Sequence, residues 1–561
     1  MSGKERKPNR SGRDPEDFHI EILDFDRDRD VYDGSLEHNI ISQVEPEVPA
    51  PRRRRRRPEP DLASFAEERL PSARRENLAE FKEEKLPVSP KEKARRRRNR
   101  QMTAVTYGFV ALFIVMMGYL VYFNQVRARD FVRNSHNARL DSMADHVIRG
   151  PILDKDGEVL AKTETDNDGA EVREYPYGKL FSHVVGYDVK GKGGLEAAYN
   201  FELLTSHAYF VEQFRNEMKG SKNPGDAIVT TLDTDLQRAA AKALGSSKGA
   251  VVAIEPDTGK VLAMYSSPTY DPSKVEANWK SLNSDKNSAL LNRATQGSYA
   301  PGSTFKVVTA LEYLRENGGD ENYLYDCNGS FTYSDTTIHC YNGRAHGRED
   351  LEQSVANSCN ASFSNIGLHL NKGKYRETAE DLLFNRKLPG PFAAKKSRFA
   401  VDKNTGPGEM MMTAMGQGNT LVSPYHLALI SSAIANDGVL MRPYIVSRVE
   451  NHRGKSVRKT IPFSYRHLMK SEEASRLKTY MRSVVTQGTG KVLNTSAYEA
   501  AGKTGTAEYS SDKSKSHSTF LGFANLDDPD IAVAVVVENA DTSGVSAVSI
   551  AKAVFDAYYR Q

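Results

Sequence analysis

The sequence predicts a mixed α/β (α+β) protein with an antiparallel sheet flanked by helices, a small accessory module and one N-terminal membrane helix. At 561 residues the chain is too long for a single ordinary domain. Strand-like segments near residue 250 and near residue 530 are separated by helical sequence, so one sheet would combine distant segments. A single long apolar segment, residues 103–123, carries no charge.

This apolar segment predicts a single-pass transmembrane helix. At about 1.5 Å per residue it matches a hydrocarbon core of about 30 Å. The basic run 91–100 lies on its N-terminal side, which predicts a cytoplasmic N-terminus and an extracytoplasmic remainder. A cleaved signal peptide would normally lie at the extreme N-terminus.

Residues 1–100 are rich in Pro, Arg, Glu and Asp and lack apolar periodicity, so we expect a disordered cytoplasmic tail. A docking tail for acidic partners or anionic lipid and a solvated tail without partners both remain open. The 77 basic and 73 acidic residues nearly balance. Net charge therefore gives no reason to expect a nucleic-acid partner.

The three cysteines are Cys327, Cys340 and Cys359. In an exported domain, Cys327 and Cys340 could form a disulfide, and unpaired buried thiols are an equal alternative. Because the chain lacks C-x-x-C and His-rich spacings, the sequence predicts neither a metal site nor a cofactor.

The exported part divides into a stem and accessory (pedestal) domain, 125–224, and a larger domain, 225–561. In the first, residues 152–160 predict a hairpin around Asp156-Gly157. The larger domain has further predicted elements, which are strands at 228–232, 249–254, 260–265, 519–524 and 531–537 and helices at 235–244 and 545–559.

The strongest chemical signal is Ser303-Thr-Phe-Lys306, which follows Pro301-Gly302 and begins an apolar-periodic helix. Residues three apart share a helix face, so the Lys306 amine would lie beside the Ser303 hydroxyl. A serine is a poor nucleophile until a base removes its proton, and a lysine can do so only when it is held neutral.

Two further elements follow, each weak by itself. Ser358-Cys359-Asn360 could be a helix cap and a turn, and Lys503 could be a surface charge. Lys503-Thr504-Gly505-Thr506 contains the one Lys-Thr-Gly of the chain. Read as a strand, it would place Lys503 and Gly505 on one face and the two threonines on the other. Four other Ser-x-x-Lys matches, which we interpret as solvated faces, begin at Ser456, Ser475, Ser510 and Ser549.

In this order, the three elements resemble the Ser-x-x-Lys, Ser-x-Asn and Lys-Thr-Gly motifs of penicillin-binding proteins and serine β-lactamases. Over residues 103–561 the chain resembles a class B penicillin-binding protein, the monofunctional transpeptidase type. Other segments that share the resemblance are Arg149–Gly157, Gly194–Glu196, Thr231–Asp233 and Gly416–Gly418.

The resemblance implies a serine β-lactamase/transpeptidase-like fold and a peptidoglycan D,D-transpeptidase in the bacterial cell membrane that serves cell shape or division. It would cross-link stem peptides through a serine acyl-enzyme formed on D-Ala–D-Ala, bind β-lactams and partner a membrane-embedded lipid-II polymerase. The implied catalytic residues are Ser303 (nucleophile), Lys306 (base), Ser358 (proton relay), Asn360 (substrate amide and Lys306) and Lys503 (positive potential). The implied substrate-binding residues are Thr504, Gly505 and Thr506.

Three other functions are compatible with parts of this motif pattern. A D,D-carboxypeptidase would use the same residues with water as acceptor. A serine β-lactamase must hydrolyse its acyl-enzyme quickly, and the class A Glu-x-x-x-Asn pattern has here only Asp381 and Asn385 as its nearest match. A non-catalytic scaffold of the wall-synthesis complex would often lack the nucleophile, whereas this chain keeps all three elements.

Overall fold

The computed structural model describes residues 89–123, 143–166, 170–508 and 515–560. The chain divides into two units, Met1–Gln101 and Met102–Gln561. Residues 1–88 of the predicted tail and residues 125–142 of the predicted stem lie outside the described residues.

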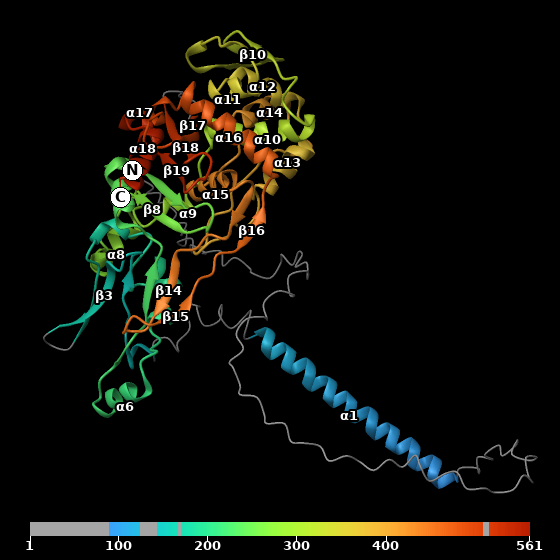
Figure 1. The fold of residues 1–561 in the computed structure, drawn as a ribbon, viewed down its shortest axis with the longest axis vertical. Helices are drawn as coiled ribbons and strands as arrows, with labels where there is room; N and C mark the ends of the chain where they lie inside the picture. Colours follow the sequence, from blue (N-terminus) through green and yellow to red (C-terminus); the bar gives the residue numbers. More distant parts are fainter. Residues whose placement is uncertain (1–88, 124–142, 167–169, 509–514, 561) are drawn as a thin grey trace, which may run out of the picture. The chain divides into compact units, whose positions relative to one another are not determined.

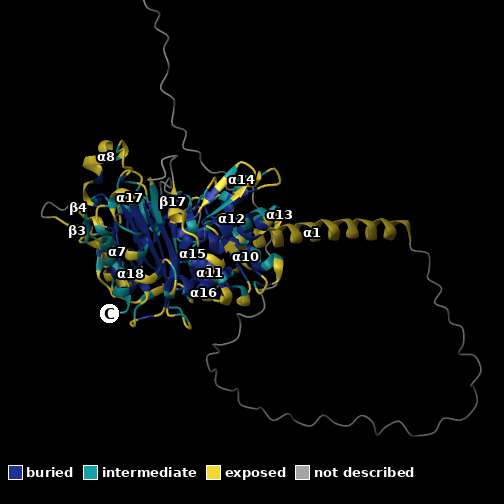
Figure 2. Ribbon diagram, turned by 90° about the horizontal axis from the view of Figure 1, so that it is seen from above, coloured by how far each residue is buried: buried dark blue, intermediate teal, exposed yellow. Residues whose placement is uncertain are grey.

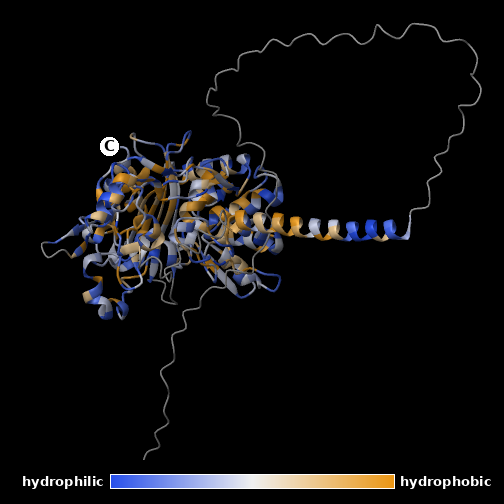
Figure 3. Cartoon of the chain, turned by 90° about the horizontal axis from the view of Figure 1, so that it is seen from below, coloured by the Kyte–Doolittle hydropathy of each residue, from blue (hydrophilic) through white to orange (hydrophobic). Residues whose placement is uncertain are grey.

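Helix α1 (Pro90–Tyr122) contains the predicted membrane segment and is long and apolar enough to cross a bilayer. Its hydrophilic first turns lead into the apolar part (Figure 3), and all its described side chains are exposed or nearly so (Figure 2). Residues 90–100 are helical, so the prediction of disorder was wrong there. Lys, Arg and Glu are good helix formers, and Glu92 pairs with Arg96 one turn later.

The core of the larger domain is a five-stranded antiparallel sheet in the order β17-β18-β19-β7-β8. Its strands are β7 (Gly249–Ile254), β8 (Val261–Ser267), β17 (Ala500–Glu508), β18 (Ser516–Ala524) and β19 (Ile531–Val537). The predicted antiparallel sheet from distant segments is confirmed.

Both faces of this sheet are buried, because alternate side chains of its strands enter two different hydrophobic clusters. Val533 and Val535 pack with α7 (Thr234–Leu244) and α18 (Ala547–Tyr558), whereas Ala532 and Ala534 lie in the cluster that contains α15 (Pro424–Ala435). The nearly continuous apolar sequences of β7 and β19 therefore follow from helices on both faces (Figure 2).

A mainly helical segment lies along the chain between β8 and β17. Its helices are η3 (Pro272–Lys274), α8 (Val275–Asn283), α9 (Arg293–Gln296), η4 (Gly302–Phe305), α10 (Lys306–Asn317), η5 (Tyr341–Gly343), α11 (Leu351–Ala356), α12 (Asn360–His369), α13 (Lys372–Asp381), α14 (Pro407–Ala414), α16 (Ser471–Thr486) and η6 (Lys491–Leu493), and α17 (Ala540–Ser543) follows β19. Short strand pairs in this segment are β9 (Tyr325–Cys327) with β12 (Gly347–Glu349), β10 (Ser330–Tyr333) with β11 (Thr336–His339), and β13 (Val439–Met441) with β16 (Ser464–His467).

The three cysteines come together beside these short strands, but none forms a disulfide. Cys327 Sγ and Cys340 Sγ are 3.7 Å apart, far beyond the 2.05 Å of a sulfur–sulfur bond. Of the two alternatives, the structure has the buried thiols.

The accessory region is organised around a second sheet, in the order β15-β14-β6-β2-β3-β4. Its strands are β2 (Ile152–Leu153), β3 (Val159–Thr165), β4 (Glu171–Glu174), β6 (Ala227–Thr230), β14 (Val446–Glu450) and β15 (Ser456–Lys459). The predicted hairpin is β2–β3. Because β6, β14 and β15 follow residue 225, the predicted domain boundary divides this sheet, and Figure 1 shows β14 and β15 across the sheet from β3.

The remaining accessory elements surround this sheet. They are β1 (Val147–Ile148), β5 (Asn223–Pro224), η2 (Gly178–Phe181), α4 (Gly194–Ala198), α5 (Asn200–Leu203) and α6 (Phe210–Met218).

A buried ion cluster joins two accessory segments that the sequence analysis had singled out. Glu196 is fully buried, and its carboxylate accepts from Arg149 Nε at 2.5 Å and from Arg173 Nε at 2.8 Å. Burial alone would raise the pKa of Glu196, but the two guanidinium charges outweigh it and lower that pKa. The carboxylate therefore stays ionised and holds the segment around Arg149 against α4.

Replacing Glu196 by Ala would leave two buried guanidinium groups without their counter-charge. We expect the free energy of unfolding of the accessory region to fall by about 3–5 kcal/mol. Hydrogen exchange of residues 149–203 and the thermal melting midpoint measure the change. Glu164→Ala is the matched control, because Glu164 pairs with Lys162 at the surface. Equal melting midpoints and equal hydrogen exchange for both variants would contradict the expected contribution of the ion cluster to stability.

Candidate active site

Ser303 lies on a tight turn at the start of a buried helix. The helix predicted to begin at Ser303 starts as the 3-10 turn η4 at Gly302 and becomes the α-helix α10 at Lys306. Gly302 has φ +59°, and a Cβ there would lie 2.6 Å from the carbonyl oxygen of Thr506. A glycine is therefore required for β17 to approach the turn this closely.

Lys306 is fully buried, and its amino group faces oxygens from two of the three predicted motifs. Nζ lies 3.0 Å from Ser303 Oγ, 3.1 Å from Ser358 Oγ, 2.8 Å from Ser358 O and 2.7 Å from Asn360 Oδ1. Burial disfavours the ammonium form and lowers the pKa of Lys306 to about 8. The neutral amine, which can accept a proton, is therefore far more populated than in an ordinary lysine.

Ser358 adopts a left-handed backbone conformation, with φ 56°. A non-glycine residue in this region carries about 1–3 kcal/mol of strain, which the surroundings must offset. The strained residue lies between α11 and α12, and its carbonyl and hydroxyl oxygens both face Lys306. Asn360 begins α12 and also donates from Nδ2 to the His339 carbonyl at 2.9 Å, so its amide is held from two sides.

Strand β17 places the Lys-Thr-Gly motif against the Ser303 turn. Its residues alternate as predicted, with Lys503 and Gly505 buried and Thr506 exposed. A Cβ on Gly505 would lie 2.2 Å from Thr519 Oγ1 and 3.0 Å from the Thr304 nitrogen, which explains the glycine.

Lys503 is the second fully buried lysine of the site. Its Nζ donates to the Thr504 carbonyl at 3.1 Å. Burial and, to a smaller extent, the nearby charge of Lys306 hold the pKa of Lys503 well below its ordinary value. A charge on Lys306 therefore opposes a second charge on Lys503.

The sequence analysis missed residues that position the motif side chains. Thr489 Oγ1 lies 2.5 Å from Thr504 Oγ1, and Thr519 Oγ1 donates to the Pro301 carbonyl at 2.9 Å. Gln417, which lies in a segment already noted for its resemblance, donates from Nε2 to the Thr506 carbonyl at 3.3 Å. Single threonines in loops and strands carry no local signal of such contacts.

This arrangement supplies a hydroxyl, a buried amine at hydrogen-bond distance and a second hydroxyl on the same amine. Serine acyl transfer requires a nucleophile, a base with an accessible neutral form, and a proton path to the leaving group. Fold and site together fit the class of serine enzymes that work through an acyl intermediate.

Comparisons with known proteins agree with this class. The family model described as the penicillin binding protein transpeptidase domain matches residues 249–556, and the penicillin binding protein A dimerisation domain matches residues 149–228. The chain belongs to the penicillin-binding transpeptidase family and is an enzyme of that kind.

Relatives and solved structures cover most of the chain. The peptidoglycan D,D-transpeptidase PbpA of Mycobacterium tuberculosis is 31% identical over 72% of this chain and 87% of its own length. The PbpA of Mycolicibacterium smegmatis is 29% identical over 82% of this chain and 99% of its own. The penicillin G acyl-enzyme complex of penicillin-binding protein A from M. tuberculosis superposes with a TM-score of 0.66, at 29% identity, over 73% of this chain and 99% of that structure.

Proposed function

We propose that this chain is a membrane-anchored peptidoglycan D,D-transpeptidase that forms its acyl-enzyme on Ser303 and is trapped there by β-lactams. The observation that carries the proposal is the buried Lys306 amine at 3.0 Å from the Ser303 hydroxyl. Relatives named peptidoglycan D,D-transpeptidases, and the β-lactam acyl-enzymes of a related protein, supply the substrate and the inhibitors.

In the acylation step, neutral Lys306 accepts the Ser303 proton while Oγ attacks the carbonyl carbon between the two D-alanines. A bond from Oγ to that carbon forms, and the carbonyl oxygen becomes negative. The backbone N–H groups of Ser303 and Thr506 would donate to this oxygen, and such a donor can be worth about 10²–10³ in rate. The close approach of β17 to the Ser303 turn supports this pairing of donors.

The tetrahedral intermediate then expels D-alanine. The amine that leaves must gain a proton, and Ser358 can relay the one held by Lys306 because its hydroxyl lies 3.1 Å from Nζ. Lys503 keeps the local potential positive when it is protonated. After this step the acyl group stays on Ser303, and Lys306 is neutral again.

Two sets of groups would hold the substrate. Asn360 would bond the substrate amide while its Oδ1 fixes Lys306 at 2.7 Å. Thr504 and Thr506 on the accessible face of β17 would bind the terminal carboxylate, and Gly505 lets the substrate backbone lie against the strand. The amine of a second stem peptide then attacks the acyl carbon and forms the cross-link, and the proton it loses passes through Lys306 to the Ser303 Oγ that is released.

The helix α1 supports a single-pass anchor, and its basic first half supports a cytoplasmic N-terminus with the enzyme outside. We assign residues 125–224 to the stem and accessory region and residues 225–561 to the transpeptidase domain. The exceptions are β6, β14 and β15, which follow residue 225 but belong to the accessory sheet. A membrane-embedded lipid-II polymerase would be the partner of anchor and accessory region, since a cross-linking enzyme needs newly made strands beside it.

Labelling with a fluorescent penicillin tests the function. We expect the detergent-solubilised full chain to form a stable adduct on Ser303 and Ser303→Ala to form none. Ser475→Ala is the matched control, since Ser475 begins an exposed Ser-x-x-Lys on α16, and it should label like the wild type.

The way labelling fails would distinguish the other functions. Wild-type chain that never labels would favour the non-catalytic scaffold, and an adduct lost within seconds would favour a β-lactamase. A stable adduct together with D-alanine release from stem peptide but no cross-linked product would favour a carboxypeptidase.

The pH dependence of acylation tests the role of Lys306. Because the amine must be neutral to accept the Ser303 proton, the rate constant should rise about tenfold per pH unit below an inflection near pH 8 and level off above it. In Lys306→Arg the group stays protonated, and the rate should fall by about 10²–10⁴ without that inflection.

Stopped-flow labelling between pH 6 and pH 10 measures both chains. Lys478→Arg, at the Ser-x-x-Lys of α16, should keep the wild-type profile, because the Lys478 amine pairs with Asp437 at 2.8 Å and lies outside the site. A wild-type rate that does not change between pH 6 and pH 9 would contradict the assignment of Lys306 as base.

A further inference from the structure

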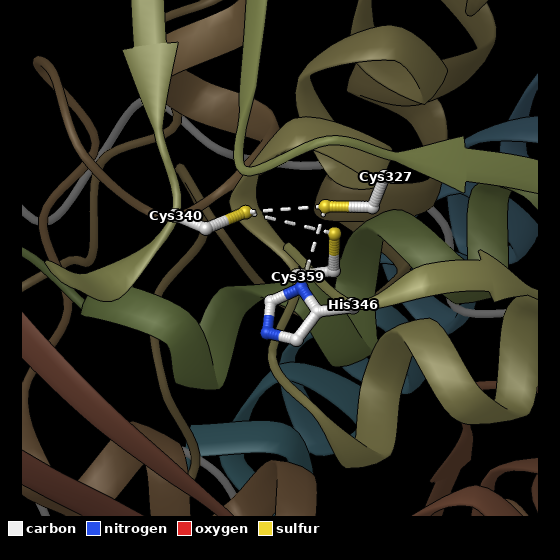
Figure 4. Close-up of side chains that lie close together, drawn as sticks. All are labelled: Cys327, Cys340, His346 and Cys359. Atoms are coloured by element: carbon white, nitrogen blue, oxygen red, sulfur yellow. Dashed lines mark hydrogen bonds between the residues drawn. The ribbon is translucent and has the colours of Figure 1, made fainter. Parts of the chain in front are cut away.

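Four potential metal ligands lie close together, and one of them belongs to the Ser358–Asn360 segment. They are Cys327 at the end of β9, Cys340 after β11, His346 before β12 and Cys359 at the start of α12 (Figure 4). One ligand atom from each lies within 4.8 Å of all the others. The three cysteines are at most 3% exposed and the His346 side chain is 8% exposed, so the cluster is shielded from solvent.

The distances within the cluster match the edges of a tetrahedral metal centre. Four S and N ligands at about 2.0–2.3 Å from one ion lie about 3.4–3.8 Å from one another. Cys327 Sγ is 3.7 Å from Cys340 Sγ and 3.4 Å from His346 Nδ1, and Cys340 Sγ is 3.8 Å from Cys359 Sγ. The remaining edges are no longer than 4.8 Å.

The surroundings of the cluster are suited to thiolates and to a cation. Backbone N–H groups of Gly329 and Ser362 donate to the sulfurs of Cys327 and Cys359, each at 3.4 Å. Such donors stabilise metal-bound thiolates. Glu349 is buried, its Oε2 has no hydrogen-bond partner, and this oxygen lies 4.0 Å from His346 Nδ1. A buried carboxylate oxygen beside three thiols calls for a positive charge nearby.

We propose that Cys327, Cys340, His346 and Cys359 bind one structural Zn²⁺ ion. Three sulfurs and one imidazole in a closed tetrahedral arrangement are the ligand set of structural zinc sites, and thiolate ligands disfavour Mg²⁺ and Ca²⁺. The expectation of no metal site rested on spacing along the chain. The hairpin β10–β11 and the pairing of β9 with β12 close those long intervals.

The ion would position the second motif of the active site. Cys359 is the residue between Ser358 and Asn360, and the Asn360 amide donates to the carbonyl of His339, the neighbour of Cys340. A metal that ties Cys359 to Cys340 fixes both sides of this contact. It would thereby hold the strained Ser358 backbone and the Asn360 oxygen against Lys306, without contacting substrate itself.

Metal analysis of the full chain, purified in detergent without chelators, tests the proposal. We expect about one zinc per chain by mass spectrometry, falling at least tenfold in Cys340→Ser and in His346→Gln. His369→Gln is the matched control, because His369 is exposed at the end of α12 and should leave the zinc content unchanged.

Cobalt substitution keeps the test decisive if a variant fails to fold. Wild-type chain stripped of zinc and given Co²⁺ should show the visible bands of a tetrahedral ion and thiolate-to-cobalt charge transfer, and added Zn²⁺ should abolish both. Less than a tenth of an equivalent of zinc before and after addition of Zn²⁺ would overturn the proposal. Zinc retained by both variants, or a Cys327–Cys340 disulfide in the purified chain, would also overturn it.

The positioning role rests on the proposed function and needs a separate readout. Zinc-stripped chain should acylate with fluorescent penicillin about 10–100-fold more slowly and recover on addition of Zn²⁺. If zinc is bound but its removal leaves acylation unchanged, the site is structural without positioning Ser358. If the zinc-loaded chain never labels, the proposed function fails while the metal site stands.

Discussion

The burial of one amino group, Lys306 Nζ, is the constraint on which the rest of the site depends. An ammonium group removed from water costs several kcal/mol unless oxygens surround it, and here four do. The same burial lowers the pKa of Lys306 to about 8, so the contacts that solvate the amine also leave it able to act as a base. A second buried amine, on Lys503, further opposes a fully protonated pair.

Three distant segments build the site around that amine. The α10 start supplies Ser303, the strained turn before α12 supplies the Ser358 oxygens, and β17 closes the site from the sheet. Each junction contains a backbone position that tolerates little change, such as Gly302 at φ +59° or Gly505 against Thr304. The cysteine–histidine cluster includes Cys359, the residue next to the strained Ser358. An added constraint there would stabilise a backbone conformation that is otherwise unfavourable.

Much of the fold could be predicted, because its periodic segments carry strong local signals. The apolar runs of β7 and β19 and the face alternation of Lys503 and Gly505 follow from burial pattern alone. The membership of β14 and β15 in the accessory sheet could not be predicted, because no local sequence pattern indicates which sheet a strand joins. For the same reason the contacts of Thr489 and Thr519 escaped the sequence, as did the convergence of His346 with three cysteines.

A titration of Lys306 itself tests the central claim most directly. The full chain, labelled with ¹³C at the lysine ε-carbons, would be followed by NMR from pH 6 to pH 11, with the Lys306 signal assigned by its loss in Lys306→Arg. We expect this signal to titrate near pH 8, far below ordinary lysines at 10.5. A Lys306 signal that titrates with the surface lysines would contradict the account, because the amine would then be charged when Ser303 must lose its proton.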